Sequence, residues 1–260
     1  MIQVTVTQEN LEYYLLILMR IASFMSVAPF FGQTNTPMRL KVGFSILISY
    51  IIYMLVPLEE AIPEYSTTIA YATLIIKESI TGLLIGFSAF ICNTILQFSG
   101  KMMDMEIGMS MAQMFDPVTQ SQVGLTGTLY SYLVFFLMLV SNMHIYLLSA
   151  VVDSFQFVPI GEIGIGDDLY KTVVGFITNY FIIGFRIILP VFAMTLILNC
   201  VLGIMAKVAP QMNMFAVGVQ FKVIVGLLVM FITVRLLPSI ANFIFEQMQQ
   251  MVNGVIKGMM

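Results

Sequence analysis

Residues 79–100 of this chain read SITGLLIGFSAFICNTILQFSG, a stretch of 22 positions without one charged side chain. A helix of about 20 predominantly apolar residues is long enough to cross the hydrocarbon core of a bilayer. The whole chain shares this character, because 59% of its 260 residues are apolar, only 10% are charged, and the mean hydropathy is +0.96. Soluble domains usually carry about 25% charged residues. The composition therefore predicts a helical protein buried in a membrane or in an apolar assembly.

The apolar runs along the chain set the expected number of helices. They cover about 11–31, 42–57, 67–98, 125–152, 169–206 and 211–238. Pro190 lies inside the long run 169–206 and predicts a kink there, because proline removes one helical hydrogen bond. The basic residues of the connecting segments favour six crossings with both termini outside. We therefore expect an all-α integral membrane protein with about six long, kinked hydrophobic helices.

Small residues and embedded charges indicate how these helices pack. Gly82 and Gly86 form a GxxxG motif, which allows close approach of a second helix. A charge at the bilayer centre costs about 2.5–3.5 kcal/mol on insertion scales. We therefore expect the embedded charges to face an acid on another helix, a partner chain or a water-filled passage. These charges are Arg20, Lys77, Glu78, Arg186, Lys222 and Arg235.

Enzymatic and nucleic-acid functions find little support. His144 is the only histidine, which excludes a multi-histidine zinc site, and no nucleotide-binding loop, HExxH motif or nucleophile elbow is present. We expect His144 to be a buried histidine bonded to a neighbouring helix, with a proton relay as the alternative. Cys92 and Cys200 are expected to be unpaired thiols. The net charge of −3 and the lack of a basic tract indicate no nucleic-acid partner, and no cofactor is expected.

A methionine-rich tract follows the opening stretch. Residues 101–116, KMMDMEIGMSMAQMFD, contain six methionines, and Gly100 and Gly108 are expected to break any helix there. Thioethers suit Cu(I), but the tract has no histidine or cysteine to complete a copper site. Methionine also adapts to irregular shapes, which suits a movable seal across a passage. Plain core filling is the third interpretation.

Six motifs follow one another in a specific order. They are RIASFMSVAPFFGQTNTPMRLKVG (20–43), KESITGLLIGF (77–87), GKMMDMEIGMSMAQMFDP (100–117), SNMHIYLLSAVVDSFQFVPIG (141–161), GFRIILP (184–190) and LGIMAKVAPQMNMFAVGVQFK (202–222). In this order they resemble the FliR/SctT family of type III secretion export-gate proteins, nearly from end to end. Two positions depart from the family pattern, with Asn142 where glycine is frequent and Lys207 where arginine is frequent.

The resemblance implies a function. It implies a non-enzymatic subunit of the flagellar export gate, which passes unfolded flagellar proteins through the bacterial inner membrane at the flagellar basal body. FliP-like and FliQ-like subunits would complete the gate, and FlhB-like and FlhA-like proteins would join it. Residues 1–168 would be a FliP-like part with a plug loop at 100–124, and residues 169–260 a FliQ-like helical hairpin, within one membrane unit of residues 1–260.

The resemblance also implies roles for particular residues. The plug would use Met102, Met103, Met105, Met109, Met111, Met114 and Phe115. Interface charges would be Arg20, Lys77, Glu78, Asp116, Arg186 and Lys222. A turn on the cytoplasmic side would contain Lys207, Pro210, Gln211 and Asn213. A small-solute or copper transporter and a passive assembly scaffold are the alternative functions.

Overall fold

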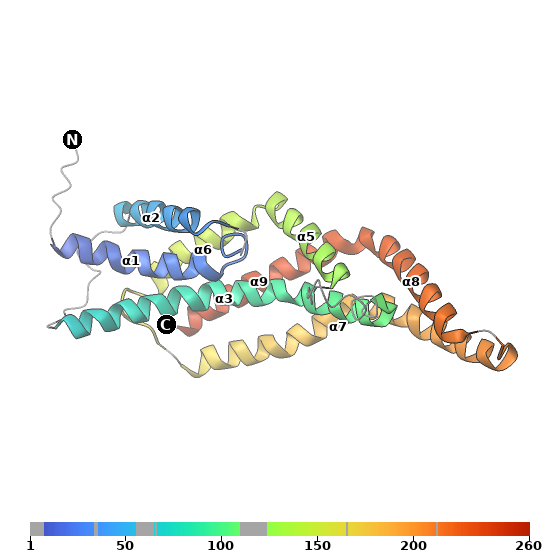
Figure 1. Cartoon of the computed structure of the whole chain (residues 1–260). Coiled ribbons are helices and arrows are strands. Elements are labelled where there is room, and N and C mark those ends of the chain that lie inside the picture. Colours follow the sequence, from blue (N-terminus) through green and yellow to red (C-terminus); the bar gives the residue numbers. More distant parts are fainter. Residues whose placement is uncertain are drawn as a thin grey trace. The chain divides into compact units, whose positions relative to one another are not determined.

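The computed structural model describes residues 8–33, 36–55, 65, 67–109, 124–164, 166–211 and 213–260. Their regular secondary structure is helical throughout (Figure 1). The elements are α1 (Gln8–Val27), α2 (Met38–Leu55), α3 (Thr68–Ile107), α5 (Leu125–Val140), α6 (Met143–Phe157), α7 (Asp167–Val208), α8 (Met214–Thr233), the 3-10 helix η2 (Val234–Leu236) and α9 (Leu237–Gly258). The prediction of an all-α protein is confirmed for this part of the chain.

The helices group into two compact units, and three of the helices contribute residues to both units. The first unit contains Met1–Cys92, Asn142–Phe176 and Glu246–Met260, and the second contains Asn93–Ser141 and Ile177–Phe245. The boundaries therefore fall inside α3, α7 and α9, and between α5 and α6. The division into a FliP-like part at 1–168 and a FliQ-like hairpin at 169–260 stays a prediction.

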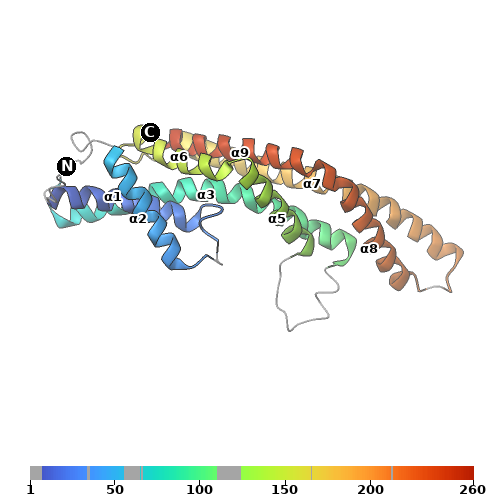
Figure 2. The ribbon, with the colours of Figure 1, turned by 90° about the horizontal axis from the view of Figure 1, so that it is seen from above.

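In the first unit, α1 lies along the N-terminal half of α3 in both views (Figures 1 and 2). A Cβ atom added to Gly82 would lie 2.0 Å from the backbone oxygen of Arg20, and one added to Gly86 would lie 2.9 Å from that of Phe24. Only glycine fits at such distances, so the close approach predicted from the GxxxG motif is confirmed. The buried residues of α1 recur every three or four positions, as expected for a helix that packs on one side.

Fewer segments are suited to cross a membrane than the six predicted. Four are long and apolar enough, Met38–Leu55, Thr68–Ile107, Leu169–Val208 and Ala216–Gly258, and a fifth results if α5 and α6 count as one span bent by 70°. These counts refer to the described residues. The run predicted at 11–31 forms α1, which is not among these candidate spans. Its 20 residues include the charged side chains of Glu9, Glu12 and Arg20.

The run 125–152 is interrupted where α5 ends and α6 begins. Asn142 there has a φ of 57°, in the left-handed region where asparagine is among the best-tolerated residues after glycine. This conformation explains why glycine is also suitable at the position. Pro190, by contrast, lies inside α7 without ending it.

Candidate functional site at the base of the methionine-rich segment

The C-terminal end of α3 forms the first half of the candidate site. The prediction that Gly100 breaks the helix is wrong, because α3 continues to Ile107. A Cβ atom on Gly100 would lie 2.0 Å from the Cα atom of Gly127 in α5, so this glycine permits a close backbone crossing. Gly108 does end the helix, with a φ of 86°. Of the loop predicted at 100–124, residues 100–107 are therefore helical, and residues 110–123 lie outside the described residues.

The methionines of the helical part differ in exposure. Met103 is only 1% exposed, whereas Met105 is 65% exposed, and both lie on α3. Met102 and Met109 are partly exposed. Core filling therefore describes Met103, and Met105 is available to contact another molecule. Met111, Met114, Phe115 and Asp116 lie outside the described residues.

Asp104 joins the end of α3 to the start of α5. Its carboxylate accepts hydrogen bonds from the backbone N–H of Thr126, at 3.3 Å to each oxygen, and from the Thr126 hydroxyl. Gly124, the residue that precedes α5, has no side chain to cap the helix, so Asp104 caps it from another helix. A Cβ atom on Gly124 would lie 2.3 Å from the Asp104 Oδ2 atom. Asp104 is 2% exposed, which strengthens these bonds.

Two further contacts fix the end of α3 to other helices of the second unit. The Thr195 hydroxyl of α7 donates to the Glu106 Oε2 atom at 3.3 Å. The side chain of Ile107 packs where Gly226 of α8 leaves space, since a Cβ atom there would lie 2.5 Å from Ile107 Cγ1. The loop base is thus formed by Gly100, Asp104, Glu106, Ile107, Gly124, Thr126, Gly127, Thr195 and Gly226. The chain leaves it at Met109 and returns to it at Gly124.

Sequence reasoning missed the loop base. The prediction of a loop at 100–124 makes Asp104 and Glu106 loop charges, and no pattern in the sequence points to Thr126 or Thr195. An acid that precedes, by 22 residues, a helix without its own capping side chain is only a weak indication of a cap. The cap can be recognised only when the two helix ends are known to be adjacent.

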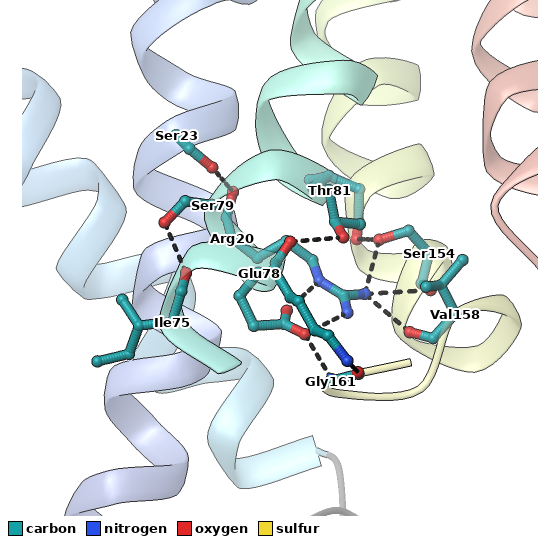
Figure 3. Close-up of polar contacts among 11 residues, drawn as sticks. Arg20, Ser23, Ile75, Glu78, Ser79, Thr81, Ser154, Val158 and Gly161 are labelled. Atoms are coloured by element: carbon teal, nitrogen blue, oxygen red, sulfur yellow. Dashed lines mark hydrogen bonds and ion pairs between the residues drawn. The ribbon is translucent and has the colours of Figure 1, made fainter. Parts of the chain in front are cut away.

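The first unit buries an ion pair between Arg20 of α1 and Glu78 of α3 (Figure 3). Arg20 Nε lies 2.6 Å from Glu78 Oε2, and Arg20 Nη2 lies 3.1 Å from Glu78 Oε1. The two side chains are 0% and 1% exposed. The backbone N–H of Gly161 also donates to Glu78 Oε1, at 2.8 Å. Buried charges require such complete pairing.

Backbone carbonyls satisfy the remaining donors of this cluster. Arg20 Nη1 donates to the oxygen of Val158 at 3.0 Å and to that of Ser154 at 3.3 Å. Its guanidinium also lies 4.2 Å from the centre of the Phe155 ring, a cation–π contact. Lys77 donates to the oxygen of Gly161 at 2.9 Å, so Lys77 and Glu78 meet other segments rather than each other.

The other embedded charges are arranged differently. Arg186 and Arg235 are exposed and Lys222 is partly exposed. The described part of the chain contains no ion pair to any of them. Pairing of Arg186 and Lys222 with another chain stays a prediction.

The remaining predicted residues can be placed individually. His144 packs edge-on against Phe30 at 6.2 Å, and its buried Nδ1 atom has no hydrogen-bond partner among the described residues. Cys92 and Cys200 are both free thiols, as predicted. Lys207, Pro210, Gln211 and Asn213 lie at the connection of α7 and α8, where the Asn213 side chain caps α8 by accepting from Ala216 N at 3.4 Å.

Long apolar helices and a wholly helical described structure define a membrane-embedded α-helical protein. Residues 11–248 match the sequence family described as bacterial export proteins, family 1, and the chain belongs to that family. The resemblance seen in the six motifs is thereby confirmed.

Curated relatives agree with this assignment. The chain is 28% identical over 236 residues to the flagellar biosynthetic protein FliR of Bacillus subtilis, with 90% of each chain covered. It is 25% identical over 258 residues to FliR of Escherichia coli K12, with 98% of each covered. FliR of Pectobacterium carotovorum is 25% identical over 237 residues, which is 91% of this chain and 90% of the relative.

Proposed function

We propose that this chain is a non-enzymatic subunit of the flagellar protein export gate in the bacterial inner membrane, at the flagellar basal body. It forms part of the channel that passes unfolded flagellar proteins, and its methionine-rich segment obstructs the closed pore. The family assignment and the flagellar names of its relatives support export as the activity. The exposed apolar side chains of α2 and α7 support burial against lipid and neighbouring subunits.

The observation that carries the plug role is the construction of the loop base. A segment that blocks a pore and yields to substrate must move without separating the helices that hold it. The close crossing at Gly100 and Gly127 and the cap from Asp104 hold the end of α3 against the start of α5. These are the two helix ends between which the segment runs. The points where the segment leaves and returns are thereby held to each other, as a movable plug requires.

The plug is tested by deleting residues 111–117, which leaves the loop base intact. The gate is assembled with its FliP-like and FliQ-like subunits, and ion leakage across the membrane is measured. We expect the deletion to raise leakage, because the methionine-rich residues no longer fill the passage. The matched control is Met111→Leu with Met114→Leu, which keeps apolar bulk and should preserve most of the seal. Unchanged leakage in a fully assembled deletion gate contradicts the plug role.

The proposed partners and the alternative functions make different predictions. As a gate subunit, the chain alone should transport nothing in liposomes and should require the FliP-like and FliQ-like subunits, with FlhB-like and FlhA-like proteins joining the assembly. A small-solute or copper transporter would work alone, and a copper site would make export sensitive to copper chelation. A passive scaffold would give no cross-link between the segment after Met109 and a stalled export substrate.

The turn of α7 and α8 is proposed to face the cytoplasm.

A further inference from the structure

The second unit contains a cavity whose described lining residues include one charged side chain. Its volume is about 290 Å³, and it is partly open to the surroundings. Leu96, Ile183, Pro190 and Ile240 form part of its apolar wall, and Arg186 supplies the charge. The hydroxyls of Tyr130 and Thr233, which also line it, lie 3.3 Å apart and bond to each other. The guanidinium of Arg186 and the Ser239 hydroxyl are therefore the polar groups left for a ligand, and only Arg186 carries a charge.

Arg186 has no charged neighbour along α7. It is the only charged residue between Lys171 and Lys207. At about 1.5 Å per residue, those lysines are about 22 and about 31 Å away along the helix. The side chains of Ile182, Phe185 and Leu189 around it are exposed and apolar. A guanidinium surrounded by apolar side chains over several helical turns needs an anion close beside it, because burying an unpaired charge is costly.

The first unit shows how a buried guanidinium forms its hydrogen bonds in this protein. There, Arg20 has a carboxylate with two contacts of 2.6 and 3.1 Å, and backbone oxygens for its other donors. Arg186 has no such acid in the described part of the chain. The planar guanidinium matches a carboxylate through two parallel hydrogen bonds. A carboxylate carried by an apolar helix of a neighbouring subunit meets both the charge of Arg186 and its apolar surroundings.

We propose that this cavity receives a helix of a neighbouring export-gate subunit, which presents an aspartate or glutamate to Arg186. Large apolar side chains of the same helix fill the cavity beside the acid. The inference rests on the proposed assembly into an export gate and names the chemistry of one contact in it. The apolar wall supplies burial, and the ion pair fixes the register of the incoming helix.

Photo-cross-linking identifies the occupant directly. A photoreactive amino acid replaces Ser239 or, separately, Leu236, both of which line the cavity and are exposed. The full chain is co-expressed with its FliP-like and FliQ-like subunits, irradiated, and analysed by mass spectrometry. We expect adducts with a peptide of one of these subunits that contains an acid in an apolar helix. Adducts only with phospholipid, adducts only with a second copy of this chain, or no adduct at either position overturn the proposal.

Substitution of Arg186 tests the ion pair. Arg186→Met leaves the partner's carboxylate buried without a countercharge, so we expect association with the other subunits to weaken by about 100-fold or more. Lys257→Met is the matched control, because Lys257 is an exposed cation in α9 that does not line the cavity, and this variant should assemble normally. Circular dichroism of each purified chain shows whether the helices are retained.

The outcomes separate this proposal from the proposed function. If the wild-type chain does not assemble with the two subunits, the export-gate proposal fails. If the wild type assembles and Arg186→Met assembles equally well, only the ion pair is refuted. Arg186→Glu combined with lysine at the cross-linked acid should restore the assembly that Arg186→Glu alone loses, and failure to restore it refutes the pairing of those two residues.

Discussion

Replacing Glu78 by glutamine removes one charge from the buried pair while nearly preserving shape. The variant leaves Arg20 charged and fully buried, and an amide takes the place of one acceptor oxygen. Glu78 accepts three charge-assisted bonds, from Arg20 Nε at 2.6 Å, Arg20 Nη2 at 3.1 Å and Gly161 N at 2.8 Å. Removing one partner of a buried ion pair costs about 3–5 kcal/mol. We expect Glu78→Gln to lower stability by that amount.

Thermal unfolding of the purified chain in a mild detergent, followed by circular dichroism, measures the effect. A loss of 1 kcal/mol shifts the midpoint by about 2–4 °C in chains of 150–250 residues, so the variant should unfold roughly 6–20 °C earlier. Glu246→Gln is the matched control, because Glu246 is exposed in α9, and its change should stay within about 0.5 kcal/mol.

A double variant refines the reasoning about the pair. Arg20→Met combined with Glu78→Leu removes both charges and leaves no unpaired ion, so it should be less destabilising than Glu78→Gln alone. A Glu78→Gln chain that unfolds at the wild-type temperature would refute the view that this pair is buried and complete. A double variant worse than the single one would show that bonds to Gly161 and Val158 matter more than the charges.

Two other predictions concern backbone positions and use the same unfolding assay. Gly100→Ala should cost about 1–3 kcal/mol because the new Cβ atom overlaps Gly127, whereas Gly203→Ala, with nothing within 4 Å, should be neutral or stabilising. Equal effects of the two substitutions contradict the close crossing of α3 and α5. Asn142→Ala should cost about 1 kcal/mol because alanine tolerates the left-handed conformation poorly, while Asn142→Gly should be close to neutral. An alanine variant as stable as the wild type contradicts the positive φ at this residue.

Local patterns in the sequence predicted the helices and one of their contacts. Apolar length identified most helical segments, and the spacing of Gly82 and Gly86 correctly predicted a close helix neighbour. The sequence also predicts that Arg20 and Glu78 need charged or polar partners, because burying an unpaired charge costs free energy. Their pairing with each other and with Gly161 depends on segments 58 and 83 residues apart, which no local pattern records.

The loop base could not be predicted for a different physical reason. Glycine weakens a helix in isolation but also permits two backbones to touch, and the sequence around Gly100 does not distinguish these effects. Its tertiary contact with Gly127 outweighed its low helix propensity. Asp104 likewise reads as a solvated loop charge until α5 is known to begin beside it. Fewer candidate spans are found than predicted, because apolar content alone reports neither the break at Asn142 nor the effect of the charges in α1.

The interleaved composition of the first unit has a consequence for the order of biosynthesis. This unit takes segments from both ends of the chain, and its last piece is Glu246–Met260. The Gly164 N–H donates to the Met259 oxygen at 2.9 Å, and Gly258 packs against the backbone of Leu169. A ribosome delivers the N-terminal residues first. The contacts that complete this unit can therefore form only after residues 246–260 have left the ribosome, when all segments of the second unit have already been synthesised.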